Sequence, residues 1–164
     1  MRLLEDIILK DSIEINASPE AVFNFLVDIT NDKSYNIWHP QDHVAFCWIK
    51  GEPWKESSVL CAKEYLTGEL HTLTFHLTKV IPNKVIEYVP SLWLLRIYYP
   101  KNSFIIEPKQ DGCIFTAMGS FRVGRIVKTF AKNKLAGGIA SVKKHLKEEG
   151  ENLKMILENK NVKE

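Results

Sequence analysis

A histidine and a glutamate one helical turn apart are the residues of this chain whose spacing first suggests chemistry. His145 and Glu149 lie in a C-terminal segment whose apolar residues recur every three or four positions, which is typical of a helix with one buried face. The apolar members of that stripe are Leu135, Ile139, Val142, Leu146, Leu153 and Ile156. Glu149 stands where the stripe requires an apolar residue. Because an unpaired buried carboxylate is costly, we expect Glu149 to be neutralised, paired or bound to a metal.

Two other segments carry side chains of the same chemical types. One is the loop sequence WHPQDH at 38–43, with Tyr35 just upstream. The other is the hairpin EYLTGELH, in which strand alternation directs Glu64 inward and places His71 on the same face as Glu69. Two imidazoles and two carboxylates from these segments would suit Zn²⁺, Mn²⁺ or Fe²⁺. The sequence therefore predicts a site that needs no cysteine.

Length and charge limit the classes of protein that this chain represents. The 164 residues are 45% hydrophobic and 26% charged, which predicts one globular domain spanning 1–164. The net charge of +2 gives little electrostatic attraction for nucleic acid, so we expect no nucleic-acid partner. A homodimer is left open.

Cysteine usage and hydropathy predict a cytoplasmic protein. Cys47, Cys61 and Cys113 show no close metal-type spacing and lie within apolar strand patterns, so buried, reduced thiols are expected. Acidic residues interrupt the N-terminal apolar stretch, which argues against a secretion signal. No stretch is long enough for a membrane span.

The elements that must position these residues can be placed from periodicity and turn signals. A strand is predicted at 6–16, followed by a helix opened by Ser18, Pro19 and Glu20, and by a second short helix at 31–37. Alternating segments then predict strands at 44–50, 57–65, 69–80, 84–89, 94–99, 102–108 and 113–123. One helix is predicted from Arg125 to about Asn159.

This order predicts an α+β fold, a curved antiparallel sheet of about seven strands wrapped around a long C-terminal helix, with two short helices after the first strand. The opening SIEINASPEAVFNFLVDI, residues 12–29, resembles the START and polyketide-cyclase superfamily. That resemblance implies the helix-grip fold and a cavity between sheet and helix. It does not by itself choose among lipid carriers, cyclases and hydrolases.

WHPQDH, EYLTGELH and the helical HLKEE together resemble the zinc-dependent phloretin and diacetylphloroglucinol hydrolases, which cleave an acyl group from a phenolic ring. The resemblance implies a divalent metal, zinc, held by His43, Glu64, His145 and Glu149. His39 is the rival for the first ligand and Glu69 for the second.

If the metal is bound, the resemblance implies that it polarises the acyl carbonyl or a water molecule, while an acid or base protonates the leaving ring carbon. The candidates for that acid or base are Tyr35, His39 and His71. Trp38, Trp48, Phe75 and Trp93 are the candidates for lining an apolar pocket.

The alternative is a carrier that binds a small hydrophobic or aromatic molecule or lipid without chemistry. In that case His145 and Glu149 would pair with each other, or with Arg96 or Arg122, and no metal would bind.

Overall fold

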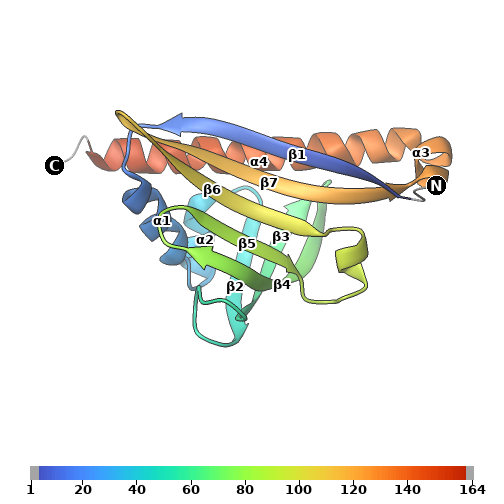
Figure 1. The fold of residues 1–164 in the computed structure, drawn as a ribbon, viewed down its shortest axis with the longest axis horizontal. Coiled ribbons are helices and arrows are strands. Elements are labelled where there is room, and N and C mark those ends of the chain that lie inside the picture. Colours follow the sequence, from blue (N-terminus) through green and yellow to red (C-terminus); the bar gives the residue numbers. More distant parts are fainter. Residues whose placement is uncertain (1–3, 162–164) are drawn as a thin grey trace.

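A computed structural model describes residues 4–161 of the chain and contains a seven-stranded sheet. Its strands are β1 (Leu4–Ile15), β2 (His43–Lys50), β3 (Val59–Leu66), β4 (Glu69–Ile81), β5 (Val85–Pro90), β6 (Lys101–Lys109) and β7 (Gly112–Gly124). The strand order is β1-β7-β6-β5-β4-β3-β2, and every neighbouring pair is antiparallel (Figure 1). The first strand thus pairs with the last, and β2 forms the opposite edge.

Two short helices follow β1, as predicted, and both begin with side-chain caps. Helix α1 (Pro19–Val27) starts after Ser18, whose hydroxyl accepts a hydrogen bond from the Ala21 N–H. Helix α2 (Asp32–Trp38) starts after Asn31, which forms a reciprocal capping box with Ser34. These caps satisfy N–H groups that the first helical turn leaves without partners. Helix α2 therefore ends directly before the His39–His43 loop.

The C-terminal helical region consists of two helices, α3 (Arg125–Phe130) and α4 (Lys132–Asn161). The prediction of one uninterrupted helix from Arg125 was therefore wrong, because the chain bends at Ala131. Helix α4 runs along β1 and β7 (Figure 1). Gly150 permits this close packing, since a β-carbon there would lie 3.1 Å from Cγ2 of Ile13.

The buried face of α4 follows the predicted stripe at its centre. Leu146 and Leu153 are buried, and the stripe continues at Leu157. Glu149 is only 5% exposed, which confirms that a carboxylate interrupts an otherwise apolar buried face. The structure thus places an acid inside the core and raises the question of what neutralises it.

Residues 94–99 do not form the predicted strand. The segment contains a short 3₁₀ helix, η1 (Leu95–Ile97), closed by successive backbone turn hydrogen bonds. The Arg96 side chain bonds to the carbonyl oxygens of Pro90 and Ser91, which fixes the turn. Apolar residues that suggested a strand are instead exposed, including Leu94 and Tyr98.

The prediction of three buried thiols was also wrong. Cys113 is buried, Cys61 is half-buried and Cys47 is exposed. Cys47 lies on the edge strand β2 and shares its outer face with Ala45, which strand alternation alone did not decide. Among the described helices, none combines the length and apolar character needed to cross a membrane.

Candidate metal centre

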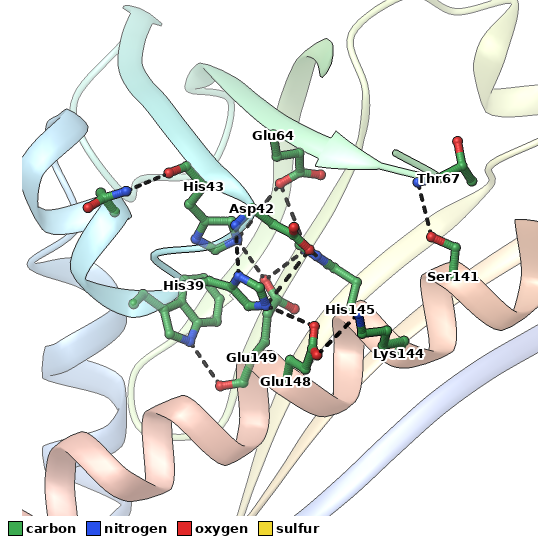
Figure 2. A network of polar contacts seen from close by, with 12 residues as sticks. His39, Asp42, His43, Glu64, Thr67, Ser141, Lys144, His145, Glu148 and Glu149 are labelled. Atoms are coloured by element: carbon green, nitrogen blue, oxygen red, sulfur yellow. Dashed lines mark hydrogen bonds and ion pairs between the residues drawn. The ribbon is translucent and has the colours of Figure 1, made fainter. Parts of the chain in front are cut away.

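Four side chains from three elements converge between the sheet and α4 (Figure 2). His43 is the first residue of β2, and its register partner on β3 is Glu64. His145 and Glu149 come from adjacent turns of α4. Trp38, the last residue of α2, connects α2 to α4, because its indole N–H donates to the backbone carbonyl of Glu149 across 3.0 Å.

The ligand-type atoms of these four residues lie close together. Nε2 of His43 is 3.9 Å from Oε2 of Glu64 and 3.5 Å from Oε1 of Glu149. Nε2 of His145 is 3.9 Å and 3.6 Å from the same two oxygens. Ligands of a tetrahedral zinc ion, bonded at about 2.0–2.1 Å, are about 3.4 Å from one another. The observed spacings are slightly wider than this value and longer than hydrogen bonds.

Burial and charge also fit a divalent cation. The four side chains are between 1% and 8% exposed, and the buried Nε2 of His43 has no hydrogen-bond partner among residues 4–161. Two buried carboxylates, with no buried lysine or arginine in the described part of the chain, would repel each other, whereas a doubly charged cation would neutralise both. The residues present therefore fit the metal that the sequence predicts.

Hydrogen bonds at the far ring nitrogens leave Nε2 of both imidazoles available as ligands. Nδ1 of His43 lies 3.1 Å from the Tyr35 backbone oxygen, and Nδ1 of His145 lies 3.1 Å from Oδ2 of Asp42. Both oxygens are acceptors, so in the neutral form of each ring Nδ1 carries the proton and Nε2 presents a lone pair to a metal. Such outer hydrogen bonds are the usual means by which proteins orient metal-binding histidines.

His39 has the opposite arrangement. Its Nδ1 accepts a hydrogen bond from the Asp42 backbone N–H, so the neutral ring carries its proton on Nε2. That Nε2 is buried, has no hydrogen-bond partner among the described residues, and lies 3.4 Å from Oε2 of Glu148. Two compact groups of metal-type residues share His145, one with His43 and Glu64 and the other with His39 and Asp42. The tautomer favours His43 over His39 as the first ligand.

Burial lowers the pKa of His39, and the neighbouring His43 and His145 lower it further. For His145, burial alone would also lower the pKa. The nearby Glu149, Glu64 and Asp42 outweigh burial, so the pKa of His145 is raised. In the metal-free protein, the imidazolium of His145 therefore supplies part of the positive charge that the carboxylates require.

Tyr35 contacts the same cluster. Its hydroxyl donates to Oε2 of Glu64 across 2.5 Å, and its ring stacks on His43 at a centroid separation of 3.8 Å. Burial, followed by the charge of Glu64, raises the pKa of Tyr35 well above its usual value. Tyr35 thus holds its proton firmly while Glu64 is ionised.

The other residues singled out in the sequence lie around or away from this cluster. Glu69 is exposed, so the geometry favours Glu64 as the carboxylate from the hairpin. His71 is half-buried and lies opposite Glu64 in the β3–β4 register.

The four aromatic candidates do not form one group. Trp38 is buried in the core, and Phe75 stacks edge-on against Tyr88. Trp48 packs against Trp54, whereas Trp93 is 68% exposed.

Two residues near the cluster were missed by the sequence analysis. Asp42 orients His145 through a hydrogen bond. The sequence signal that could have identified Asp42 is its position directly before His43 in the loop. Tyr88 lies on β5 at the same parity as the buried Ile86, which the alternation of that strand could have revealed. Burial, then Glu149 and Glu64, raises the pKa of Tyr88 well above its usual value.

Sequence comparison identifies the family. Residues 6–151 match the model of a family described as polyketide cyclase / dehydrase and lipid transport. The chain belongs to this family. Membership supports the predicted superfamily and the binding of a small hydrophobic molecule, but it does not select the zinc-dependent hydrolases. Among curated protein sequences, none matches the chain closely enough to count as a relative.

Solved structures show the same fold at low sequence identity. The KanY protein is 13% identical, with a TM-score of 0.71, and the match covers 94% of this chain and 99% of that one. The di-domain ARO/CYC protein BexL from the BE-7585A biosynthetic pathway is 14% identical (TM-score 0.66), covering 93% of this chain and 50% of BexL. A norcoclaurine synthase from Thalictrum is 11% identical (TM-score 0.60), covering 89% and 97%. These similarities confirm the helix-grip fold.

Proposed function

We propose that this chain is a metal-dependent hydrolase that cleaves the carbon–carbon bond between an acyl group and a phenolic ring. The observation that carries the proposal is the convergence of Nε2 of His43 and His145 on carboxylate oxygens of Glu64 and Glu149, at 3.5–3.9 Å and away from solvent. These four residues would hold the cation, with zinc as the leading candidate.

A divalent cation supplies Lewis acidity toward a carbonyl oxygen and lowers the pKa of water. The protein's own residues must then bind the ring and manage protons. Hydrolysis adds hydroxyl to the acyl carbon and a proton to the ring carbon, giving a carboxylic acid and a deacylated phenol. A proton donor must therefore face the ring carbon that leaves.

Among the three predicted donors, the geometry favours Tyr35. Its hydroxyl lies 2.5 Å from Glu64, within the cluster, whereas Nε2 of His39 faces the half-buried Glu148 and His71 lies beyond Glu64. A cation that engages Glu64 would weaken the attraction of that carboxylate for the phenolic proton and make Tyr35 a better acid. Tyr88 is a second phenol near the cluster, and its neighbouring carboxylates are Glu149 and Glu64.

The non-enzymatic alternative is a carrier of a hydrophobic molecule, which the lipid transport members of the family favour. For such a carrier, the sequence allowed His145 or Glu149 to pair with Arg96 or Arg122. Arg96 instead bonds to backbone carbonyls, and Arg122 pairs with Asp6. Of the pairings that this alternative offered, the one between His145 and Glu149, at 3.6 Å, remains.

Elemental mass spectrometry on untagged protein, purified without chelator or a nickel column, tests the proposal. We expect about one equivalent of zinc, manganese or iron, lost in His145→Ala and kept in His76→Ala, because His76 lies on the face of β4 opposite to His71. The metal-loaded protein should then release a carboxylic acid from an acylated phenol. Protein that neither contains nor binds these metals would contradict the hydrolase proposal and favour the carrier.

A further inference from the structure

Two cysteines face each other across neighbouring strands, outside the candidate metal centre. Cys47 on β2 and Cys61 on β3 are direct partners in the antiparallel register. Cys47 is exposed and Cys61 is half-buried. Directly paired residues of this kind have β-carbons about 4.5–5.5 Å apart. A disulfide requires about 3.5–4.5 Å, so only a small approach of the strands is needed.

The position of Cys47 makes that approach feasible. Strand β2 forms one edge of the sheet, so no further strand of residues 4–161 holds its outer side. The β2–β3 register also shifts on both sides of the pair, between His43 and Ala45 and between Trp48 and Lys50. Such irregularities bend a strand locally and relax its pairing. The edge strand can therefore close on β3 without disturbing the centre of the sheet.

We propose that Cys47 and Cys61 form a reversible cross-strand disulfide when the protein meets a low-molecular-weight disulfide oxidant of the glutathione type. Cys47 is the attacking residue because it is the more exposed of the two. Burial raises the pKa of the Cys61 thiol, with a further contribution from Cys47, so Cys61 reacts second.

The disulfide forms by two successive thiol–disulfide exchange steps. The Cys47 thiolate attacks oxidised glutathione, forms a mixed disulfide and releases one reduced glutathione. The Cys61 thiolate then attacks the Cys47 sulfur, forms the protein disulfide and releases the second reduced glutathione. Two protein thiols are oxidised, one oxidant is reduced, and the protons of the two cysteines leave with the two glutathione molecules.

The bond would join the two strands that carry His43 and Glu64, which are themselves register partners. A cross-link there restricts the unfolded chain and holds the edge strand against β3. We therefore expect oxidation to raise the melting temperature of the protein and to slow opening of the β2–β3 edge. This effect does not depend on metal binding, so chelator-treated protein should show it too.

Tryptic mapping after equilibration in a glutathione redox buffer tests the proposal. Cleavage at lysine and arginine places the three cysteines on separate peptides, 34–50 for Cys47, 56–63 for Cys61 and 110–122 for Cys113. We expect the first two peptides to be joined, with a mass two hydrogens lower than their sum, and Cys113 to stay reduced. Adding a reductant should separate them and restore the original melting temperature.

Three variants complete the test. Cys47→Ser and Cys61→Ser should abolish both the joined peptide and the rise in melting temperature, while Cys113→Ala should keep both. A glutathione adduct that persists on wild-type Cys47, a dimer linked through Cys47, or thiols that remain free throughout the redox titration would each overturn the proposal. Because mapping of the wild-type protein suffices for these outcomes, poor folding of Cys61→Ser would not weaken the test.

Discussion

Nε2 of His43 lies 3.5 Å from Oε1 of Glu149, so the first residue of β2 meets a residue near the end of the chain. Both groups are polar, yet His43 is 1% exposed and Glu149 is 5% exposed. Burial of both groups is costly unless each gains a strong partner. The relationship between these two atoms is the basis of the predictions on metal binding.

Removing the charge of Glu149 should remove the metal. In Glu149→Gln we expect the affinity for zinc to fall more than about 100-fold, beyond the usual effect of losing an outer hydrogen bond to a ligand, while the fold persists. Isothermal titration of chelator-treated protein measures the affinity, and circular dichroism checks the fold. Glu151→Gln is the matched control, because Glu151 lies on the same helix and pairs with Lys147 at the surface. Equal zinc affinities in the two variants would exclude Glu149 as a ligand.

Asp42 should matter through its effect on His145. Asp42→Asn keeps the size of the side chain but weakens the acceptor that fixes the Nδ1 proton, so zinc affinity should fall about 10- to 100-fold. Competition with a fluorescent chelator measures the change. Asp28→Asn, at the exposed end of α1, serves as control. If the Asp42→Asn variant binds zinc as tightly as wild type, Asp42 has no positioning role.

The hydroxyl of Tyr35 should affect turnover more than binding. In Tyr35→Phe we expect zinc stoichiometry to be kept and kcat on an acylated phenol to fall about 100- to 10,000-fold, as is usual when a general acid is lost. Tyr65→Phe, at an exposed tyrosine on β3, should leave kcat unchanged. Normal turnover by the Tyr35→Phe variant would shift the assignment to His39, His71 or Tyr88.

The contribution of His145 should make the metal-free protein less stable as the pH rises above about 6.5. The pKa of His145 in the folded state is raised above its ordinary value of 6.5. The stabilising effect of its imidazolium is therefore complete below about pH 6.5 and lost as the pH passes through the higher folded-state pKa. Thermal melts between about pH 6 and pH 9 should show this decrease in wild type and a weaker one in His145→Gln. A pH-independent difference between the two proteins would count against the effect.

The approach of α4 to β1 can be tested with two glycines of the same helix. Gly137→Ala should stabilise the protein by about 0.5–1 kcal/mol, because alanine favours the helix and its β-carbon would meet nothing within 4 Å. Gly150→Ala should lack this gain, because its β-carbon would lie 3.1 Å from Ile13. Urea unfolding of both variants measures the difference. A gain at Gly150 equal to that at Gly137 would show that the helix packs less tightly than described.

Local sequence patterns were sufficient for most of the fold. The apolar stripe around Leu146 and Leu153 predicted the helix and its buried face, and it identified Glu149 as a buried acid. Strand alternation likewise placed Glu64 inward. These predictions succeeded because side-chain direction repeats every 3.6 residues in a helix and every two in a strand.

Periodicity failed where long-range contacts control the backbone. The apolar segment 94–99 matched a strand pattern, but Arg96 binds carbonyls at 90–91 and holds the segment in a 3₁₀ turn. The pairing of Cys47 with Cys61 depended on the β2–β3 register, which the register shifts in that pair make hard to derive from turn positions alone.

The sequence by itself determined which residues could serve a metal and on which faces most of them lie. Only the tertiary structure gives a reason to prefer His43 to His39 as a candidate ligand, because that preference rests on which ring nitrogen is protonated. That proton is fixed by the Asp42 N–H in His39 and by the Tyr35 carbonyl in His43. A hydrogen-bond partner at the far ring nitrogen depends on the path of the backbone in the loop, which residue types and spacing do not specify.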